Sequence, residues 1–284
     1  MAIFFALVSF FSWGVADVLA ALASRRSGNL LTFFWALFIA FVLFSLYIPW
    51  AGQIADINVF VWVFIISLVN QIGTLYFLKG LELGNATLVI TIAGSFALVT
   101  VLISQIFFHE VISPIQSLGI VAVIVGIILA SLNVKEISGK KVNSIFSDKG
   151  VIFALCAFVG WGIYYAFIGR AVARIGLFWS YYPINFFFLI LILFKEVRVN
   201  WGKVLRDNKG LIYIISWSVF AVLGIFSYYL GVSKGLVSIV AAIASASPIL
   251  SVILTRIFFK EKLTSQQKIG VISSLAGIVL ISFS

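Results

Sequence analysis

Ile106-Phe107-Phe108-His109-Glu110 is repeated later in the chain as Ile257-Phe258-Phe259-Lys260-Glu261, an offset of 151 residues (106 to 257). Nearer the start of each half, Trp13-Gly14 matches Trp161-Gly162 at an offset of 148 (13 to 161). The offset of 151 also aligns Gly73, Gly80, Gly84, Gln116, Gly119 and Gly126 with Gly224, Gly231, Gly235, Gln267, Gly270 and Gly277. A register kept over this distance indicates two copies of one unit.

The composition of the chain is that of a membrane protein. The chain is 63% hydrophobic and 10% charged, with a mean hydropathy of +1.21, whereas soluble domains are about 25% charged. Apolar runs long enough to cross a hydrocarbon core as helices recur along the chain, without the period-two alternation of membrane strands. We predict an all-α integral membrane protein with ten transmembrane helices at approximately 2–24, 30–50, 58–79, 85–108, 114–132, 150–173, 177–195, 210–232, 236–258 and 267–283.

Charge predicts orientation and partner. The net charge of +10 comes from Lys and Arg between the apolar runs, so we expect the lipid bilayer, and not nucleic acid, to be their partner. In the ten-span arrangement nearly all of them fall on one side, and only Arg170, Arg174 and Lys234 fall on the other. The positive-inside rule makes the basic side cytoplasmic and places both termini outside a plasma (cell inner) membrane.

Residues 133–149 lack a sustained apolar pattern and are predicted to form a cytoplasmic linker between repeats at 1–132 and 150–284. Five spans per repeat is an odd number, so the second copy enters the membrane inverted. Inverted repeats are typical of secondary transporters, whose substrate site lies between the halves and opens to each side in turn. A lipid-linked flippase or a channel-like uniporter remains the alternative on the same fold.

The combined pattern resembles the drug/metabolite transporter superfamily, EamA type. It is carried by the early Trp-Gly pairs, the Phe-x-Glu ending spans four and nine, the Gln-x-x-Gly at Gln116 and Gln267, and Pro248. The resemblance implies two inverted five-helix repeats around a cavity lined by helices 1, 3, 4, 6, 8 and 9, and transport of amino acids, other metabolites, nucleotide sugars or drugs. It also implies cytoplasmic termini, against the charge pattern. Ala97 stands where the second half has Pro248, so any proline hinge would be one-sided.

Asp17 is the sharpest individual candidate. It lies within the first span, one helical turn after Trp13. An ionised carboxylate there costs about 2.5–3.5 kcal/mol on insertion scales, so it should face protein or water. We predict that Asp17 lines the cavity, where it binds a cationic group or carries a coupling proton. The alternative is a structural role, as a salt bridge or a water-mediated cap with Arg25 or a nearby amide.

Polar residues in the third span are the second candidate group. Asn70, Gln71 and Thr74 correspond to Ala221, Val222 and Ile225 in the second half. Maintenance of a shared fold would favour similar residues in both copies, whereas a bound metabolite has no such symmetry. We therefore predict a substrate contact, with interhelical hydrogen bonding as the alternative.

Aromatic and small residues complete the candidate cavity. Trp13, Trp161, Tyr165 and Tyr228 offer faces for stacking or cation–π contact, whereas Tyr181 and Tyr182 have the pattern of interfacial anchors. Ser245, Ser247 and Pro248 are candidate wall residues on a small-faced ninth span. Glu110 and Glu261 lie at span ends, where we expect an interfacial ion pair or a gate latch.

Other functional classes find little support. The chain has one cysteine, Cys156, and one histidine, His109, which excludes an intrachain disulfide and leaves no metal-ligand cluster. A serine protease would need a base beside its serine, and no histidine lies within a predicted span. An aspartyl protease would need two acids within the membrane, and only Asp17 qualifies. We predict no enzyme, no cofactor and no metal, a small-molecule substrate, and a monomer with a dimer as the open alternative.

Overall fold

The computed structural model describes residues 1–131, 149–258 and 264–282, which form helices and turns without a strand. The first half contains α1 (Ala2–Ser27), α2 (Asn29–Ser45), the 3₁₀ turn η1 (Ile48–Trp50), α3 (Ile57–Leu83), α4 (Ala86–Gly94), α5 (Ala97–Phe108) and α6 (Pro114–Ser131). The second contains α9 (Lys149–Tyr181), η2 (Tyr182–Phe187), α10 (Phe188–Leu191), α11 (Lys195–Arg206), α12 (Asn208–Val232), α13 (Val237–Ala244), α14 (Ser247–Phe258) and α15 (Ser265–Ser282). Apart from Lys149, the predicted linker lies outside the described residues, as does Glu261.

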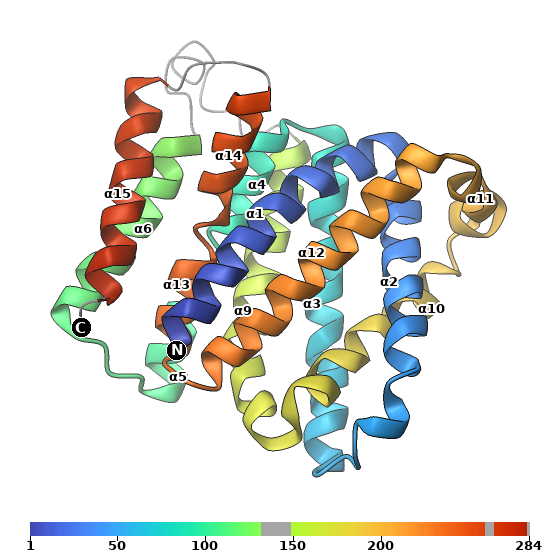
Figure 1. Ribbon diagram of the computed structural model, residues 1–284, viewed down its shortest axis with the longest axis horizontal. Helices are drawn as coiled ribbons and strands as arrows, with labels where there is room; N and C mark the ends of the chain where they lie inside the picture. The colour runs from blue at the N-terminus through green and yellow to red at the C-terminus, as the bar shows by residue number, and fades with distance from the viewer. Residues whose placement is uncertain (132–148, 259–263, 283–284) are drawn as a thin grey trace.

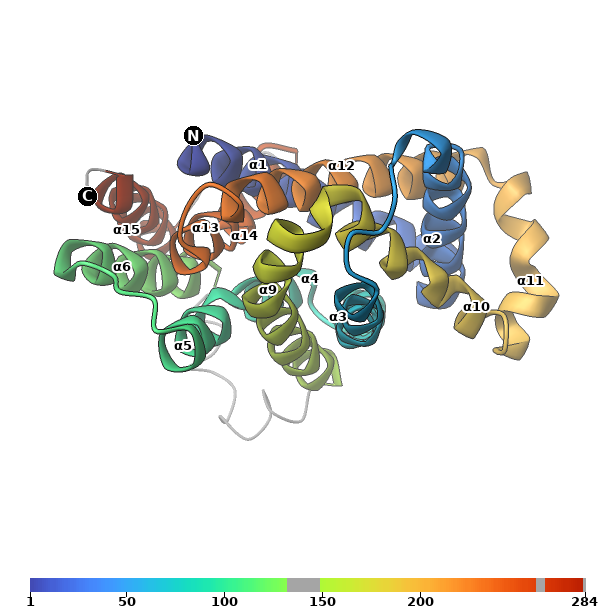
Figure 2. The same cartoon turned by 90° about the horizontal axis from the view of Figure 1, so that it is seen from below.

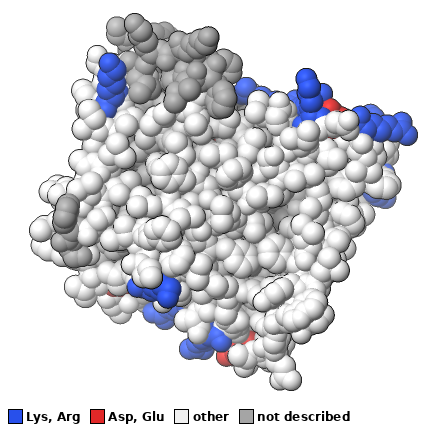
Figure 3. Space-filling view, in the orientation of Figure 1, with Lys and Arg blue, Asp and Glu red and all other residues white. Residues whose placement is uncertain are grey.

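Length and composition suit these helices to a bilayer. Within the described ranges, six helical segments are long and apolar enough to cross a membrane: Ala2–Ser27, Ile57–Leu83, Ala86–Phe108, Lys149–Leu191, Asn208–Val232 and Val237–Leu254. Asn29–Ser45 and Pro114–Ala130 are shorter apolar helices. On the face in Figure 3, Lys, Arg, Asp and Glu gather at two opposite rims, and the band between them carries no charged side chain among the described residues. The prediction of an all-α membrane protein is confirmed; the count of ten crossings stays a prediction.

The apolar run at 177–195 is not the single helix that we predicted. The predicted boundary before this run is present, because Gly176 has φ +77°, a left-handed conformation that interrupts α9 and that glycine adopts without a Cβ clash. The chain then passes into the 3₁₀ helix η2, where Pro183 lacks a backbone donor, and into the four-residue α10. Hydrophobicity alone carries no signal for this break.

Spans four and nine break at corresponding positions. Ser95 and Phe96 separate α4 from α5, and Ser245 and Ala246 separate α13 from α14. Both breaks contain i to i−3 backbone bonds, Ser95 N to Ile92 O (3.3 Å) and Ala246 N to Ile243 O (3.2 Å). A proline follows the break in the second half only, at Pro248, so the break in the first half forms without one. Serine hydroxyls at both breaks bond to carbonyls of the preceding turn, which helps to interrupt a helix without proline.

Corresponding residues exchange places where the two halves meet. Gly14 of α1 corresponds to Gly162 of α9, and Leu250 of α14 corresponds to Val99 of α5. A Cβ on Gly14 would lie 2.7 Å from Leu250, and a Cβ on Gly162 would lie 2.4 Å from Val99. Ser251 Oγ donates to Gly14 O at 2.9 Å, and the counterpart pair joins Thr100 Oγ1 to Gly162 O at 3.0 Å. Two copies related by a two-fold exchange produce this pattern, which packs α1 beside α12 and α3 beside α9.

Helices α6 and α15 form a close pair at one edge of the molecule (Figures 1 and 2). A Cβ on Gly119 would lie 2.8 Å from Gly277 O, and one on Gly126 would lie 2.6 Å from Gly270 O, so the helices run antiparallel. Small residues permit this approach, and van der Waals contact between the backbones replaces the hydrophobic driving force that lipid removes.

Glu110 joins the halves at the start of α13. Its carboxylate accepts hydrogen bonds from Val237 N (2.9 Å), Ser238 N (3.0 Å) and Ser238 Oγ (2.7 Å). The N-cap of α13 is Leu236, which has no capping side chain, so an acid from the other half satisfies the free amides. The predicted latch position is thus a contact across the halves, made to helix donors rather than to a basic side chain.

Candidate functional site

A cavity lies between the two halves and holds about 880 Å³ of empty space, its open side included. Its walls come from α1, α3 and α4 of the first half and from α9, α12 and α14 of the second, together with α2 and η2. The lining residues are Trp13, Ala16, Asp17, Phe33, Ala36, Leu37, Ala40, Asn70, Gln71, Thr74, Phe77, Gly94, Phe96, Trp161, Tyr165, Tyr181, Ile184, Trp217, Ser218, Ala221, Val222, Ile225 and Ser247.

The structure brings together most of the site residues that the sequence suggested, namely Trp13, Asp17, Asn70, Gln71, Thr74, Trp161, Tyr165 and Ser247. Tyr228, Ser245 and Pro248 do not line the cavity. Tyr228 is fully buried behind it, stacks on Trp13 with ring centroids 5.8 Å apart, and donates to Tyr165 O at 3.1 Å. Ser245 donates to Ala242 O at 3.1 Å, and the ring of Pro248 packs against Gly94.

Asp17 is the one charged side chain among the residues that line the cavity. The hydroxyl of Ser247 donates to Asp17 Oδ2 at 3.5 Å, and Ser251 is a second hydrogen-bond partner. The alternative of a salt bridge with Arg25 is not what the structure contains, because Arg25 donates to Leu81 O (3.1 Å) and Gly84 O (3.2 Å). Asp17 therefore faces the cavity with serine hydroxyls beside it and without a paired cation among the lining residues.

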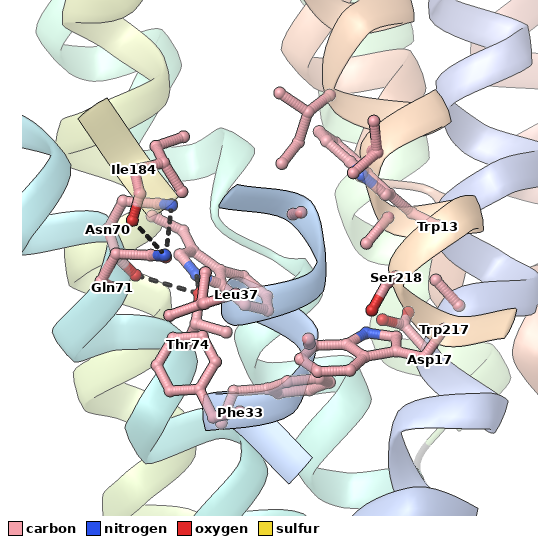
Figure 4. A pocket seen from close by; sticks show the side chains of 18 of the residues that line it. Trp13, Asp17, Phe33, Leu37, Asn70, Gln71, Thr74, Ile184, Trp217 and Ser218 are labelled. Carbon is pink, nitrogen blue, oxygen red and sulfur yellow. Dashed lines mark hydrogen bonds between the residues drawn. The ribbon is translucent and has the colours of Figure 1, made fainter. Parts of the chain in front are cut away.

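Asn70 and Gln71 form a directed chain of amides on the opposite side (Figure 4). Gln71 Nε2 donates to Ile184 O at 3.1 Å, and Asn70 Nδ2 donates to Gln71 Oε1 at 3.1 Å. Because the Ile184 carbonyl only accepts, Gln71 must turn its NH₂ toward it and present its oxygen to Asn70. The Asn70 NH₂ group donates to Gln71, and Asn70 Oδ1 is buried without a hydrogen-bond partner.

Local secondary structure makes this chain possible. Ile184 belongs to the 3₁₀ helix η2, packed beside α3. Thr74, one turn after Asn70, bonds to the Asn70 carbonyl at 3.0 Å and accepts the indole N–H of Trp161 at 3.1 Å. The α3 wall is thus tied to both η2 and α9, which fixes the position of its polar groups.

Aromatic rings line part of the cavity. Trp13 contacts Tyr165 with centroids 5.2 Å apart, and Phe96 contacts Tyr165 at 4.8 Å. Phe77 lies 4.9 Å from Trp161. Tilted and edge-on rings at these distances form a rigid apolar surface.

Several residues that line the cavity were not predicted from the sequence. Tyr181 was expected at the membrane interface with Tyr182, but both are buried, and Tyr181 faces the cavity because the chain turns inward after Gly176. Trp217 and Ser218 precede Ala221 and Val222 by one turn of α12, a spacing that identifies them once those positions are known to face the cavity. Phe33 and Leu37 of α2 carry no signal in an apolar sequence.

Comparisons with known proteins agree on the fold. The model of the EamA-like transporter family matches residues 1–132 and 148–283. An uncharacterized protein of Methanocaldococcus jannaschii is 31% identical over 137 residues, which cover 98% of that protein and 48% of this chain. The uncharacterized transporter YojE of Bacillus subtilis is 25% identical over 143 residues, about half the length of each chain (48% and 48%). A solved crystal structure superimposes with a TM-score of 0.74 at 14% identity, covering 99% of this chain and 96% of the other, and so supports the fold alone.

Proposed function

This chain belongs to the EamA-like transporter family, and from that premise we propose that it is a secondary active transporter of a small polar or amphipathic metabolite. The cavity between the halves is the single observation that carries the proposal. Its residues come from both copies, and the contacts around it exchange corresponding residues. Because the two halves make equivalent contacts, they can tilt against each other in two equivalent directions. Each tilt exposes the central site to one side of the membrane.

Asp17 is the residue that we assign to coupling. A carboxylate in a mostly apolar cavity binds either a proton or a cationic group of the substrate, and transport that alternates between the two couples their fluxes. Ser247 stands at the break before α14, so a movement of that break would change the environment of Asp17.

The membrane arrangement follows from the charges. We propose a plasma-membrane location, a monomeric carrier and a cytoplasmic basic rim that includes α11 with Lys195, Arg198, Lys203 and Arg206. A single cysteine at Lys141, in a Cys156→Ala background, should resist an impermeant thiol reagent in intact cells. Labelling there would place the linker outside and reverse the orientation.

Counterflow in proteoliposomes tests the transport proposal. Vesicles are loaded with an unlabelled candidate, and a carrier then accumulates the labelled form transiently, whereas a channel only equilibrates it. We expect counterflow for at least one small metabolite, with loss of its pH dependence in Asp17→Asn. Equilibration without overshoot would favour the channel-like alternative, and movement of a labelled lipid would favour the flippase.

A further inference from the structure

The chemistry of the cavity wall narrows the substrate class. We infer that the cavity binds an amphipathic organic cation that carries a protonated amine at one end, a flat apolar body, and a hydrogen-bond donor at the other end. This inference rests on the proposed function, because it describes the ligand of the same cavity. It is independent of how the transport cycle is coupled.

Charge sets the first requirement. The cavity lining contains Asp17 and no Lys, Arg or His among the described residues. A carboxylate or phosphate on the substrate would meet the field of Asp17 without a paired cation, whereas an ammonium group would neutralise it. The cavity therefore disfavours anions, and it also disfavours amino acids, whose carboxylate would stay unpaired.

The amide chain sets the second requirement. The Ile184 carbonyl fixes the direction of both amides, so Asn70 Oδ1 is the atom left over. A buried acceptor without a partner costs about 1–3 kcal/mol, which a donor from the ligand would recover. A donor group of the ligand would pair with this oxygen, so the far end of the substrate should carry an O–H or N–H.

The space between the two ends sets the third requirement. Figure 4 shows Asn70 and Gln71 on one side of the cavity and Asp17, Trp217 and Ser218 on the other, with Phe33 and Leu37 between them. The surfaces that bridge the polar ends are apolar and largely aromatic. A planar or aromatic body covers such walls well, and a cation beside Trp217 or Trp13 also gains cation–π attraction.

Four related probes separate these requirements. Tyramine has an ammonium group, a ring and a distal hydroxyl; phenethylamine lacks the hydroxyl; tyrosine adds a carboxylate; 3-(4-hydroxyphenyl)propionate replaces the ammonium with an anion. Binding to purified wild-type protein in detergent, measured by calorimetry, should favour tyramine over phenethylamine by about tenfold, the effect of one hydrogen bond to a buried acceptor. Tyrosine should bind at least about tenfold more weakly than tyramine, and the anion should not bind.

Variants assign the two ends. Asn70→Ala should reduce the preference for tyramine over phenethylamine to within about twofold, whereas Asp17→Asn should weaken both amines by the same factor. Asn58→Ala, the same change at an exposed site on α3, should leave both affinities unchanged. The wild-type ranking tests the class even where a variant fails to fold.

The outcomes distinguish this inference from the transport proposal. Equal or tighter binding of tyrosine or the anion, no binding of either amine, or a hydroxyl preference that survives in Asn70→Ala would overturn the substrate class. Counterflow of an unrelated solute would still uphold transport in those cases. Tight tyramine binding with no counterflow would instead contradict transport and uphold the ligand chemistry.

Discussion

Helices α3 and α12 occupy corresponding places in the two halves, yet they present opposite chemistry to the same cavity. Asn70, Gln71 and Thr74 of α3 line it, and so do their counterparts Ala221, Val222 and Ile225 of α12. The surrounding contacts did not diverge in this way: Trp161 packs against Gly73, and Trp13 packs against the counterpart Gly224. The contacts between the two copies occur twice, so the same residue types are needed at both places. A single asymmetric ligand needs polar partners on one wall of the cavity only.

The helix starts of the two halves show the same division. Asn85 caps α4 with its own side chain, accepting from Leu88 N at 3.3 Å, whereas α13 depends on Glu110 from the other half. Asp56 caps α3, whereas its counterpart Asp207, before α12, pairs with Arg26 of α1. The starts of α13 and α12 thus have a bond to the other half, whereas the bonds at the starts of α4 and α3 are local, so movement of the halves should affect the two sets differently.

The largest effect is expected where the halves are most alike. Gly126→Leu would place a Cβ 2.1 Å from Ser274 Oγ and 2.6 Å from the Gly270 carbonyl. Overpacking against backbone has no cheap relief, so we expect a loss of about 3 kcal/mol in the free energy of unfolding. Thermal unfolding and yield in detergent measure it. Gly202→Leu is the matched control, because nothing lies within 4 Å of a Cβ at that position; equal stability of the two variants would contradict the close pairing of α6 and α15.

A second test makes the two walls alike. The triple change Asn70→Ala, Gln71→Val and Thr74→Ile gives α3 the residues of α12, and we expect counterflow to fall at least about tenfold, or 1.4 kcal/mol, because the wall loses its hydrogen-bonding groups. The unfolding temperature should fall far less than in Gly126→Leu. Full transport by a folded triple variant would mean that the polar groups serve packing alone.

A third test concerns the cap that crosses the halves. Glu110→Ala removes the acceptor for the α13 amides, and loss of a cap costs about 1 kcal/mol in the free energy of unfolding. Adding Leu236→Asp supplies a local cap, as Asn85 does for α4, and should restore most of that loss in thermal unfolding. Failure of the double variant to recover would indicate that Glu110 acts through another contact.

The sequence predicted the parts of this molecule that depend on pattern. The membrane class followed from composition, the duplication followed from register, and Asp17 and Asn70 stood out because polar groups are rare in apolar spans. The boundary at Gly176 was predicted between two spans, whereas the 3₁₀ segment η2 inside the run at 177–195 was missed, since apolar residue type does not distinguish it from an α-helix. The contributions of Phe33, Leu37 and Tyr181 to the cavity were missed because their role is set by tertiary packing, which apolar residue type does not encode.

The smallest effect is expected at the exposed pair of Arg26 and Asp207, which joins the end of α1 to the start of α12. The Arg26 guanidinium, 2.5 Å away, lowers the pKa of Asp207 below its usual value. A lowered pKa in the folded state means that the pair stabilises the fold above the ordinary aspartate pKa and loses this contribution as the pH falls through the lowered value. Asp207→Asn should therefore show a slightly weaker acid dependence of the unfolding temperature than wild type between pH 7 and about 3, and 1 M salt should reduce the difference because the pair is exposed. Asp56→Asn is the control, since asparagine still caps α3; an equal change in both variants would mean that Asp207 acts as a helix cap like its counterpart, and that the halves do not differ at this position.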